Sequence, residues 1–472
     1  MRQIHFMLFP AITYRDRRRE LCEKLGSGVA LFPANDYVGR NYRDNTYSFR
    51  QDSNFLYYGG LQEAHVALLV DADLGKTTLY GEDRSLADVV WEGPHPTLAE
   101  RAERIGADSY RPLSALAADL AAYAKRQRLH YLPPYRPAVA LELQTYLQRD
   151  AAALQAGVSL PLIRAVIAQR SYKSAEEVAD MERAVTISGQ MHTDVMRHAR
   201  AGMREAELAG RARSLAMRGG GDIAYGIILT TQGQTLHNHH HTNTLETGQL
   251  VLGDFGAETA LRYAGDITRT FPVSARFDER QRTLYELVLR AENEAIAAVR
   301  PGVAYRDLHL QAARTISSGL KDLGLMRGDV DEAVAAGAHA LFFPHGLGHM
   351  IGLDVHDMEG LGEDHVGYDD TIRRSEQFGT AYLRLGKKLE TGFTLTVEPG
   401  LYFIPALIDQ WAAADKHTTF INYAALADYR NFGGIRIEDD VLVTETGGRV
   451  LGEPIPKTVE EVEALRAAAV EG

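Results

Sequence analysis

The stretch "GQLVLGDFGAETALRYAGDITRTFPV", residues 248–273, contains two β-rich runs separated by a short polar segment, a pattern typical of a β-hairpin. Each run presents one aspartate among mainly apolar residues, Asp254 in the first and Asp266 in the second. We expect the two carboxylates to face each other across the hairpin, where they repel unless a cation lies between them. The stretch therefore predicts a cation site.

Two further acids and a group of histidines follow in the C-terminal half. Glu398 lies in "TLTVEPGLY", residues 394–402, and Glu438 lies in "GGIRIEDDVLV", residues 433–443; both runs resemble strands. The stretch "FFPHGLGHMIGLDVHD", residues 342–357, adds three histidines among glycines. A single acid at a strand end is usually solvated, and a lone histidine usually has a structural role. Four isolated acids together with a histidine instead favour an oxygen-rich site for a pair of Mn²⁺, Co²⁺ or Zn²⁺ ions.

The composition limits the class of protein. The chain has 472 residues, of which 45% are hydrophobic and 24% charged, as is ordinary for a globular protein of two domains. With 51 basic and 63 acidic residues the formal net charge is −12, so we expect neither nucleic acid nor membrane as a partner. The apolar run at residues 4–12 is too short to span a bilayer. The one cysteine, Cys22, cannot form an internal disulfide, and we expect a cytoplasmic protein.

The first third of the chain is expected to form a compact α/β domain. Its strands are predicted at 28–33, 65–70, 77–81 and 129–134, with an alanine-rich helix at 114–127. Ser174 and Glu177 in "SAEE" form a capping box, which marks the start of a new helix. We therefore place a domain boundary near residue 165, with an N-terminal domain over 1–165 and a catalytic domain over 166–472.

These motifs occur in an order that resembles a known family. "LHN", "GDFGAE", "YAGDITRTFPV", "PHGLGHMIGLDVHD", "LTVEPGLYFI" and "GGIRIEDDVLVTETG" together resemble the Xaa-Pro peptidases of the pita-bread fold, the group that contains prolidase and aminopeptidase P. The N-terminal "YSFRQDSNFLYYGGL", residues 47–61, resembles the leading domain of aminopeptidase P and of the long prolidases. The resemblance implies an α/β creatinase/prolidase-like N-terminal domain and an α+β pita-bread metallopeptidase domain.

The resemblance also implies a role for each motif residue. Two divalent ions, with Mn²⁺ expected and Co²⁺ or Zn²⁺ as alternatives, would be bound by Asp254, Asp266, His349, Glu398 and Glu438. The catalytic residues would be Glu398, as general base and proton carrier to the prolyl nitrogen, with His356 and His237. The substrate-binding residues would be His345, Arg384 and Arg436. The stretch between Asp254 and Asp266 is one residue longer than is usual in the family, which we assign to the hairpin tip or a bulge.

Three functions remain open. An Xaa-Pro dipeptidase needs a cation for the proline carboxylate, and Arg384 in "AYLRLGKKLETGF" would supply it, whereas an Xaa-Pro aminopeptidase needs a cleft that stays open beyond proline. The long insertion between Glu398 and Glu438 resembles the prolidases more closely, so we favour the dipeptidase. A non-catalytic pita-bread protein is less expected, because all five ligand positions are filled. The expected partners are small proline-containing peptides and a second copy of the chain in a homodimer.

Overall fold

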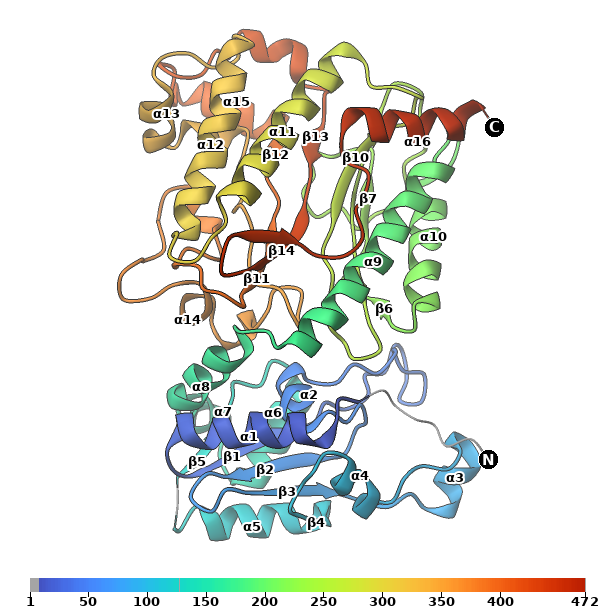
Figure 1. Cartoon of the computed structure of the whole chain (residues 1–472), viewed down its shortest axis with the longest axis vertical. Coiled ribbons are helices and arrows are strands. Elements are labelled where there is room, and N and C mark those ends of the chain that lie inside the picture. Colours follow the sequence, from blue (N-terminus) through green and yellow to red (C-terminus); the bar gives the residue numbers. More distant parts are fainter. Residues whose placement is uncertain (1–7, 127, 472) are drawn as a thin grey trace. The chain divides into compact units, whose positions relative to one another are not determined.

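The computed structural model describes residues 8–126 and 128–471, which divide into two compact units (Figure 1). The first unit comprises Met1–Arg170 with Gly360–Gly362, and the second comprises Ser171–Glu359 and Glu363–Gly472. The expected boundary near residue 165 falls within the last helix of the first unit. No described helix is long and apolar enough to cross a membrane. Part of the apolar run at 4–12, and Gln127 at the end of a predicted helix, lie outside the described residues.

A mixed five-stranded sheet with the order β4-β3-β2-β1-β5 forms the centre of the first unit. Its strands are β1 (Val29–Pro33), β2 (Ala67–Asp71), β3 (Lys76–Gly81), β4 (Ser109–Pro112) and β5 (Leu129–Tyr131). Four of them confirm the predicted strands. The edge strand β4 was not predicted, because all four of its residues are exposed and it lacks an apolar alternation.

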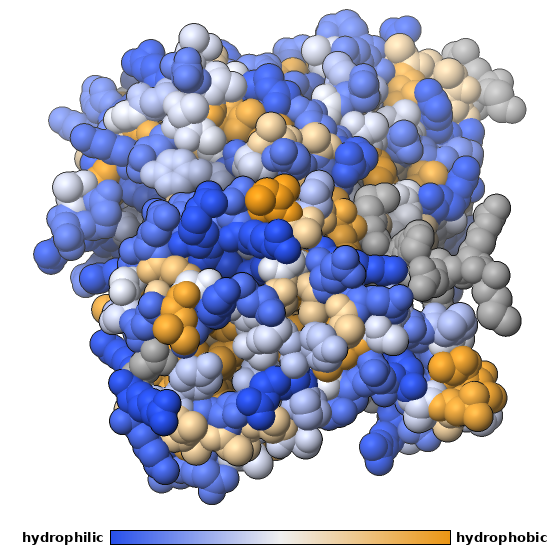
Figure 2. Space-filling model, turned by 60° about the horizontal axis from the view of Figure 1, so that its bottom comes forward, coloured by the Kyte–Doolittle hydropathy of each residue, from blue (hydrophilic) through white to orange (hydrophobic). Residues whose placement is uncertain are grey.

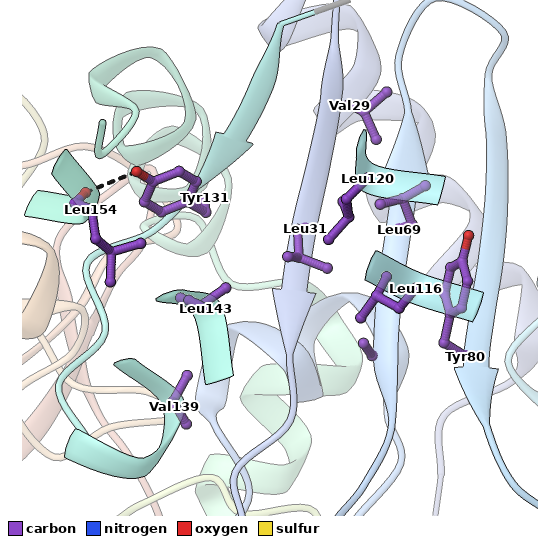
Figure 3. Close-up of a cluster of buried hydrophobic side chains, with 11 residues drawn as sticks. Val29, Leu31, Leu69, Tyr80, Leu116, Leu120, Tyr131, Val139, Leu143 and Leu154 are labelled. Carbon is purple, nitrogen blue, oxygen red and sulfur yellow. Dashed lines mark hydrogen bonds between the residues drawn. The ribbon is translucent and has the colours of Figure 1, made fainter. Parts of the chain in front are cut away.

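One face of this sheet packs against helices to form an apolar core (Figure 3). Val29, Leu31 and Leu69 contribute from neighbouring strands, and Leu116 and Leu120 contribute from α5. Alternate strand residues point to opposite faces, so this pattern leaves a second apolar face for other helices. The helices of the unit are α1 (Ala11–Leu25), α2 (Ser53–Gly59), α3 (Leu86–Glu92), α4 (Leu98–Arg104), η1 (Leu113–Ala115), α5 (Leu116–Tyr123), α6 (Pro137–Leu147), α7 (Ala151–Ala156) and α8 (Leu160–Arg170).

Two pairs of long helices flank the strands of the second unit: α9 packs with α10, and α11 packs with α12 (Figure 1). The predicted capping box begins α9, where the Ser174 hydroxyl accepts a hydrogen bond from the backbone N–H of Glu177 and the Glu177 carboxylate accepts one from the backbone N–H of Ser174. The helices are α9 (Ala175–His198), α10 (Glu205–Arg218), α11 (Glu279–Ala298), α12 (Tyr305–Asp322), α13 (Val330–Ala336), η2 (Ala338–Leu341), η3 (Glu359–Leu361), α14 (Glu363–Gly367), η4 (Thr380–Tyr382), α15 (Pro405–Ala413), η5 (Ala425–Tyr429) and α16 (Val459–Glu471).

The strands between these helices form short antiparallel ladders, β10-β8-β7, β11-β14-β15, β12-β13 and β6-β9. They are β6 (Asp222–Ile223), β7 (Ile228–Thr230), β8 (Leu250–Asp254), β9 (Ala257–Glu258), β10 (Thr268–Pro272), β11 (Thr394–Val397), β12 (Gly400–Tyr402), β13 (Gly434–Arg436), β14 (Asp439–Val443) and β15 (Gly448–Val450). A bridge between Thr268 and Glu438 joins the first ladder to the segment between β13 and β14. The ends of several strands therefore meet at one place.

The predicted hairpin of β8 and β10 is present, but its register differs from the expected one. Asp254 pairs with Thr268, and Asp266 lies before β10 rather than opposite Asp254. The chain between the strands forms a smaller hairpin of its own, with Glu258 bridged to Ala264. Its length moves Asp266 off the ladder and towards the end of β8.

The face of the molecule drawn in Figure 2 is largely hydrophilic. On the face shown in Figure 2, hydrophilic residues predominate and apolar residues form separate patches. This agrees with a chain of net charge −12 whose apolar residues mainly fill the two cores.

Candidate metal centre and active site

Asp254 and Asp266 share one hydroxyl group. The Tyr225 Oη atom lies 2.7 Å from Asp254 Oδ1 and also contacts Asp266 Oδ1, and both aspartates are buried. Burial, and then the nearby carboxylates, raise the pKa of Tyr225 well above its usual value, so the phenol is neutral. Although they are not opposite each other on the ladder, the two aspartates therefore come together at the end of the hairpin.

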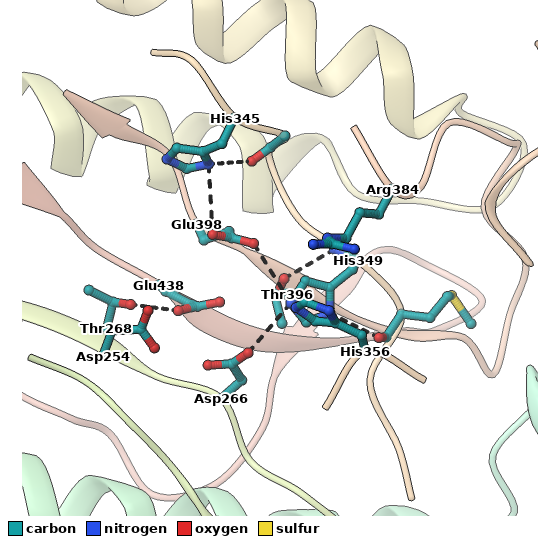
Figure 4. A network of polar contacts seen from close by, with 12 residues as sticks. Asp254, Asp266, Thr268, His345, His349, His356, Arg384, Thr396, Glu398 and Glu438 are labelled. Carbon is teal, nitrogen blue, oxygen red and sulfur yellow. Dashed lines mark hydrogen bonds and ion pairs between the residues drawn. The ribbon is translucent and has the colours of Figure 1, made fainter. Parts of the chain in front are cut away.

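Glu438 joins this pair from a distant part of the chain. Its Oε2 accepts a 2.7 Å hydrogen bond from Thr268 Oγ1, and its side chain is buried. Arg436, two residues earlier, forms an ion pair with Asp254 and donates through Nε to Thr268 Oγ1 at 3.2 Å. The hydroxyl of Thr268 thus links a carboxylate and a guanidinium, and Figure 4 shows its hydrogen bond to Glu438.

His349 faces two of the acids. Its Nδ1 bonds to the Met350 carbonyl at 2.9 Å, which leaves Nε2 3.4 Å from Asp266 Oδ2 and 3.7 Å from Glu398 Oε1 (Figure 4). The residue before it must be glycine, because a Cβ on Gly348 would lie 2.2 Å from the Thr396 carbonyl oxygen. That close approach lets the histidine loop lie against β11, whose end carries Glu398.

The electrostatics of this cluster fit a cation. Ligand atoms of Asp266, His349 and Glu438 all lie within 4.8 Å of one another. Burial, and then the neighbouring carboxylates, raise the pKa of Glu438 well above its usual range and that of Glu398 to about 7. Gathering several carboxylates in a buried space is unfavourable without positive charge, and divalent ions supply that charge. Four carboxylates with one imidazole are a donor set suited to Mn²⁺, Co²⁺ or Zn²⁺.

Three other predicted residues border the cluster. His345 Nε2 lies 2.8 Å from Tyr402 Oη, and its Nδ1 lies 3.8 Å from Glu398 Oε2. Burial lowers the pKa of His345 to about 3, so its ring is neutral at pH 7. Arg436 Nη1 donates to the same Tyr402 hydroxyl at 2.8 Å. His237 lies in a turn, and burial, followed by the positive charge of Arg436, lowers its pKa.

His356 and Arg384 lie on the other side of His349. The rings of His349 and His356 pack edge to face, with centroids 4.2 Å apart. Arg384 does not contact the five predicted ligands through any ion pair among the described residues; its Nη1 bonds instead to Glu359 Oε2 at 2.7 Å and Glu363 Oε1 at 2.8 Å. Glu359 Oε2 is also 3.0 Å from His356 Nδ1. Arg384 is therefore connected to His356 through one carboxylate.

The histidine run from His239 to His241 lies in a loop. His240 is exposed, and His241 Nε2 bonds to the carbonyl of Ile227 at 2.9 Å. Among the described residues, no hydrogen bond or ion pair joins His240 or His241 to the acidic cluster.

Sequence reasoning missed four residues of the site: Tyr225, Thr268, Tyr402 and Glu359. Each is a common residue type in an unremarkable local pattern, and each takes its place through contacts that its own stretch of sequence does not reveal. Tyr402 lies in the quoted "TLTVEPGLY" and Thr268 lies in "YAGDITRTFPV". Both residues were therefore inside motifs that we connected with the site, but neither was assigned a role from the sequence.

Comparison with known proteins places this geometry in a family. Residues 179–445 match Metallopeptidase family M24, and residues 14–131 match Aminopeptidase P, N-terminal domain. The first match covers more than half of the chain, so the protein belongs to metallopeptidase family M24. The expected fold, an N-terminal α/β domain with a pita-bread metallopeptidase domain, is confirmed.

Individual relatives carry two different activities in their names. The human Xaa-Pro dipeptidase is 30% identical, over 97% of this chain and 94% of its own length. The Xaa-Pro aminopeptidase of Escherichia coli strain K12 is 32% identical, over 97% and 98%. Among solved structures, Pseudomonas aeruginosa aminopeptidase PepP is 31% identical with a TM-score of 0.81, covering 98% of this chain and all of its own. A zinc-substituted Escherichia coli aminopeptidase P in complex with product is 30% identical with a TM-score of 0.80, covering 98% and 99%. Because both activities occur at similar identity, the preferred peptide length has to be argued from the site.

Proposed function

We propose that the protein is an Xaa-Pro dipeptidase that uses two divalent ions, with Mn²⁺ as the expected metal. The observation that carries the dipeptide preference is the position of Arg384, which is separated from His356 by a single carboxylate. A cation at that distance from a catalytic histidine suits the free carboxylate of a C-terminal proline.

The Xaa-Pro bond explains why this machinery is useful. It is a tertiary amide without an N–H group, so peptidases that hydrogen-bond that group process it poorly. Two ions held by Asp254, Asp266, His349, Glu398 and Glu438 would activate a water molecule and polarise the scissile carbonyl. The five proposed ligands come from strand ends and one glycine-rich loop, which together hold them in a fixed arrangement.

The side chains around the ligands divide the remaining work. Glu398 is the proposed general base, and it would return the proton to the prolyl nitrogen as that group leaves. His237 would donate a hydrogen bond to the substrate carbonyl or the developing oxyanion, and His356 would act on the substrate and the transition state through Nε2. His345 is held by Tyr402 beside Glu398, where its neutral ring would contact the bound peptide.

Arg384 would bind the proline carboxylate. Its side chain is 33% exposed, and its bonds to Glu359 and Glu363 both come from Nη1, so the guanidinium presents other N–H groups to a ligand. A guanidinium can bind a carboxylate through two parallel hydrogen bonds, which a lysine cannot reproduce.

An Xaa-Pro aminopeptidase is the second candidate. The two carboxylates that bind Arg384 favour it, because they neutralise part of the charge that a substrate carboxylate would need. A non-catalytic binding protein is the third candidate, and the complete acidic cluster argues against it.

Hydrolysis of Gly-Pro and of Gly-Pro-Xaa tripeptides by the Mn²⁺-loaded protein tests the proposal. We expect a preference for Gly-Pro, and Arg384→Ala should reduce kcat/KM for Gly-Pro by about 1.5–3 kcal/mol in transition-state stabilisation. Arg384→Lys should recover little of this loss, and Arg373→Ala, at an exposed arginine earlier in the chain, serves as the control.

A wild-type preference for tripeptides, with no effect of Arg384→Ala, would instead identify an aminopeptidase. Failure to cleave either peptide would favour the non-catalytic protein.

A further inference from the structure

The chain reverses sharply just after His356. Met358 has a left-handed backbone (φ 63°), which is uncommon for a residue with a side chain. The reversal allows the backbone N–H of Glu359 to donate to the His356 carbonyl at 3.3 Å. It also returns the Glu359 side chain to the imidazole of His356.

A buried ion pair holds this turn in place. Asp357 lies between His356 and the reversal, and its Oδ2 is 2.9 Å from Lys173 Nζ, with each side chain 1% exposed. The N–H of Asp357 also donates to the Met350 carbonyl at 2.9 Å. The turn is thus fixed from outside, and the position of Glu359 follows from it.

The carboxylate of Glu359 joins two functional groups through one oxygen. Its Oε2 bonds to His356 Nδ1 at 3.0 Å and to Arg384 Nη1 at 2.7 Å. Its Oε1 is buried and has no hydrogen-bond partner among the described residues. Burying a carboxylate oxygen without a hydrogen-bond partner is unfavourable, so stability alone does not explain this arrangement.

We propose that Glu359 is a positioning residue that orients His356 and connects it to Arg384. This inference rests on the proposed Xaa-Pro peptidase function, and it goes further by assigning a residue outside the predicted set. A carboxylate only accepts hydrogen bonds, so His356 Nδ1 must carry the proton of that bond. Nε2, on the other side of the ring, is then the nitrogen left for substrate.

The hydrogen bond from Arg384 to Glu359 also connects His356 to the proposed binding position of the substrate carboxylate. A proline carboxylate bound by Arg384 would lie on the far side of Glu359 from His356. Occupation of that position would act on the histidine through the shared Oε2, so Glu359 should influence kcat more than KM.

Glu363 provides a matched control. It also accepts a hydrogen bond from Arg384 Nη1, at 2.8 Å, but its other ion pair is with Arg374. Among the described residues, no hydrogen bond or ion pair joins Glu363 to His356. An effect transmitted only through Arg384 should appear in variants of both glutamates. An effect that depends on His356 should appear only in variants of Glu359.

The kinetic test compares Glu359→Ala, Glu359→Gln and Glu363→Ala on Gly-Pro, with metal content and melting temperature measured for each. We expect Glu359→Ala to lower kcat roughly tenfold or more with little change in KM and unchanged metal content, the usual effect of removing a partner that orients a site residue. Glu359→Gln should recover part of kcat, because its amide oxygen can still accept from Nδ1. Glu363→Ala should stay within about twofold of wild type, and Glu359→Ala should add nothing when His356 is already alanine. Equal losses for both glutamates, or additive losses with His356→Ala, would overturn the proposal.

A spectroscopic test needs no turnover. ¹⁵N imidazole spectra of the full chain would be recorded without metal and with Zn²⁺. The His356 signal is the one that is absent from the spectrum of His356→Ala. In the wild-type chain this signal should show the Nδ1–H tautomer. Glu359→Ala should shift it towards the Nε2–H form, and Glu363→Ala should not. An unchanged tautomer in Glu359→Ala would overturn the role of Glu359. A wild-type chain that cleaves neither peptide would overturn the proposed function, and the tautomer result would then decide the role of Glu359 by itself.

Discussion

Replacing Lys173 with methionine should destabilise the second unit by about 3–5 kcal/mol, the usual penalty for breaking a buried ion pair. Lys173 Nζ and Asp357 Oδ2 are 2.9 Å apart, and each side chain is 1% exposed. At this distance and an effective dielectric constant of about 20, their attraction is about 6 kcal/mol. Desolvation offsets part of it, but methionine would take the ammonium away and leave the carboxylate buried.

Denaturant unfolding, followed with a spectroscopic signal that reports on the second unit, would measure this change in the free energy of unfolding. Lys76 is the matched control, because its ammonium also lies 3.0 Å from a carboxylate, on Asp108, but with side chains 63% and 39% exposed. Lys76→Met should therefore change the unfolding free energy by less than about 1 kcal/mol.

Adding Asp357→Asn to Lys173→Met should restore much of the stability, because no buried charge remains without its counter-ion. The reasoning would be refuted if Lys173→Met behaved like Lys76→Met, or if the double variant were as unstable as the single one.

Three further predictions concern the site and the core. Asp266→Ala should lose at least one metal ion by elemental analysis and nearly all turnover, and retention of two ions with full activity would contradict its proposed role. His356→Ala should lower kcat roughly a hundredfold with unchanged metal content, whereas exposed His240→Ala should leave turnover nearly unchanged. Burial lowers the pKa of His309 to about 3 and that of His339 to about 4. Above pH 6.5 both histidines are neutral in the folded chain and in the unfolded chain. As the pH falls towards 4, the histidines of the unfolded chain bind protons before those of the folded chain. The unfolding free energy should therefore fall by about 1.4 kcal/mol per histidine per pH unit. His309→Phe should make that decline shallower, and an identical slope would contradict a neutral buried ring.

Much of the candidate site could be predicted from the sequence because its acids are isolated within apolar strands. Asp254, Asp266, Glu398 and Glu438 stand out in this way. The structure brings Asp266, Glu398 and Glu438 close to His349, and Tyr225 joins Asp254 to Asp266. Strands of the first sheet were predicted for a related reason, because short aliphatic runs bounded by turn residues are typical of buried strands.

Other features depend on contacts that local sequence cannot encode. The register of β8 with β10 is set by the small hairpin between them, so Asp266 does not face Asp254 on the ladder. Tyr225 approaches the aspartates from a glycine-rich segment whose local sequence does not indicate this contact. Glu359 depends on the left-handed Met358, a conformation that no propensity predicts for methionine.

The hydrogen bond from Thr268 to Glu438 joins residues 170 positions apart. During synthesis at about 5–20 residues per second, the ribosome needs roughly 10–30 s to move from the first of these codons to the second. Throughout that interval the nascent chain carries two aspartates without the glutamate that completes their cluster. Metal acquisition should therefore follow translation: ribosome-bound chains stalled before Glu438 should not retain divalent metal, whereas the released protein should.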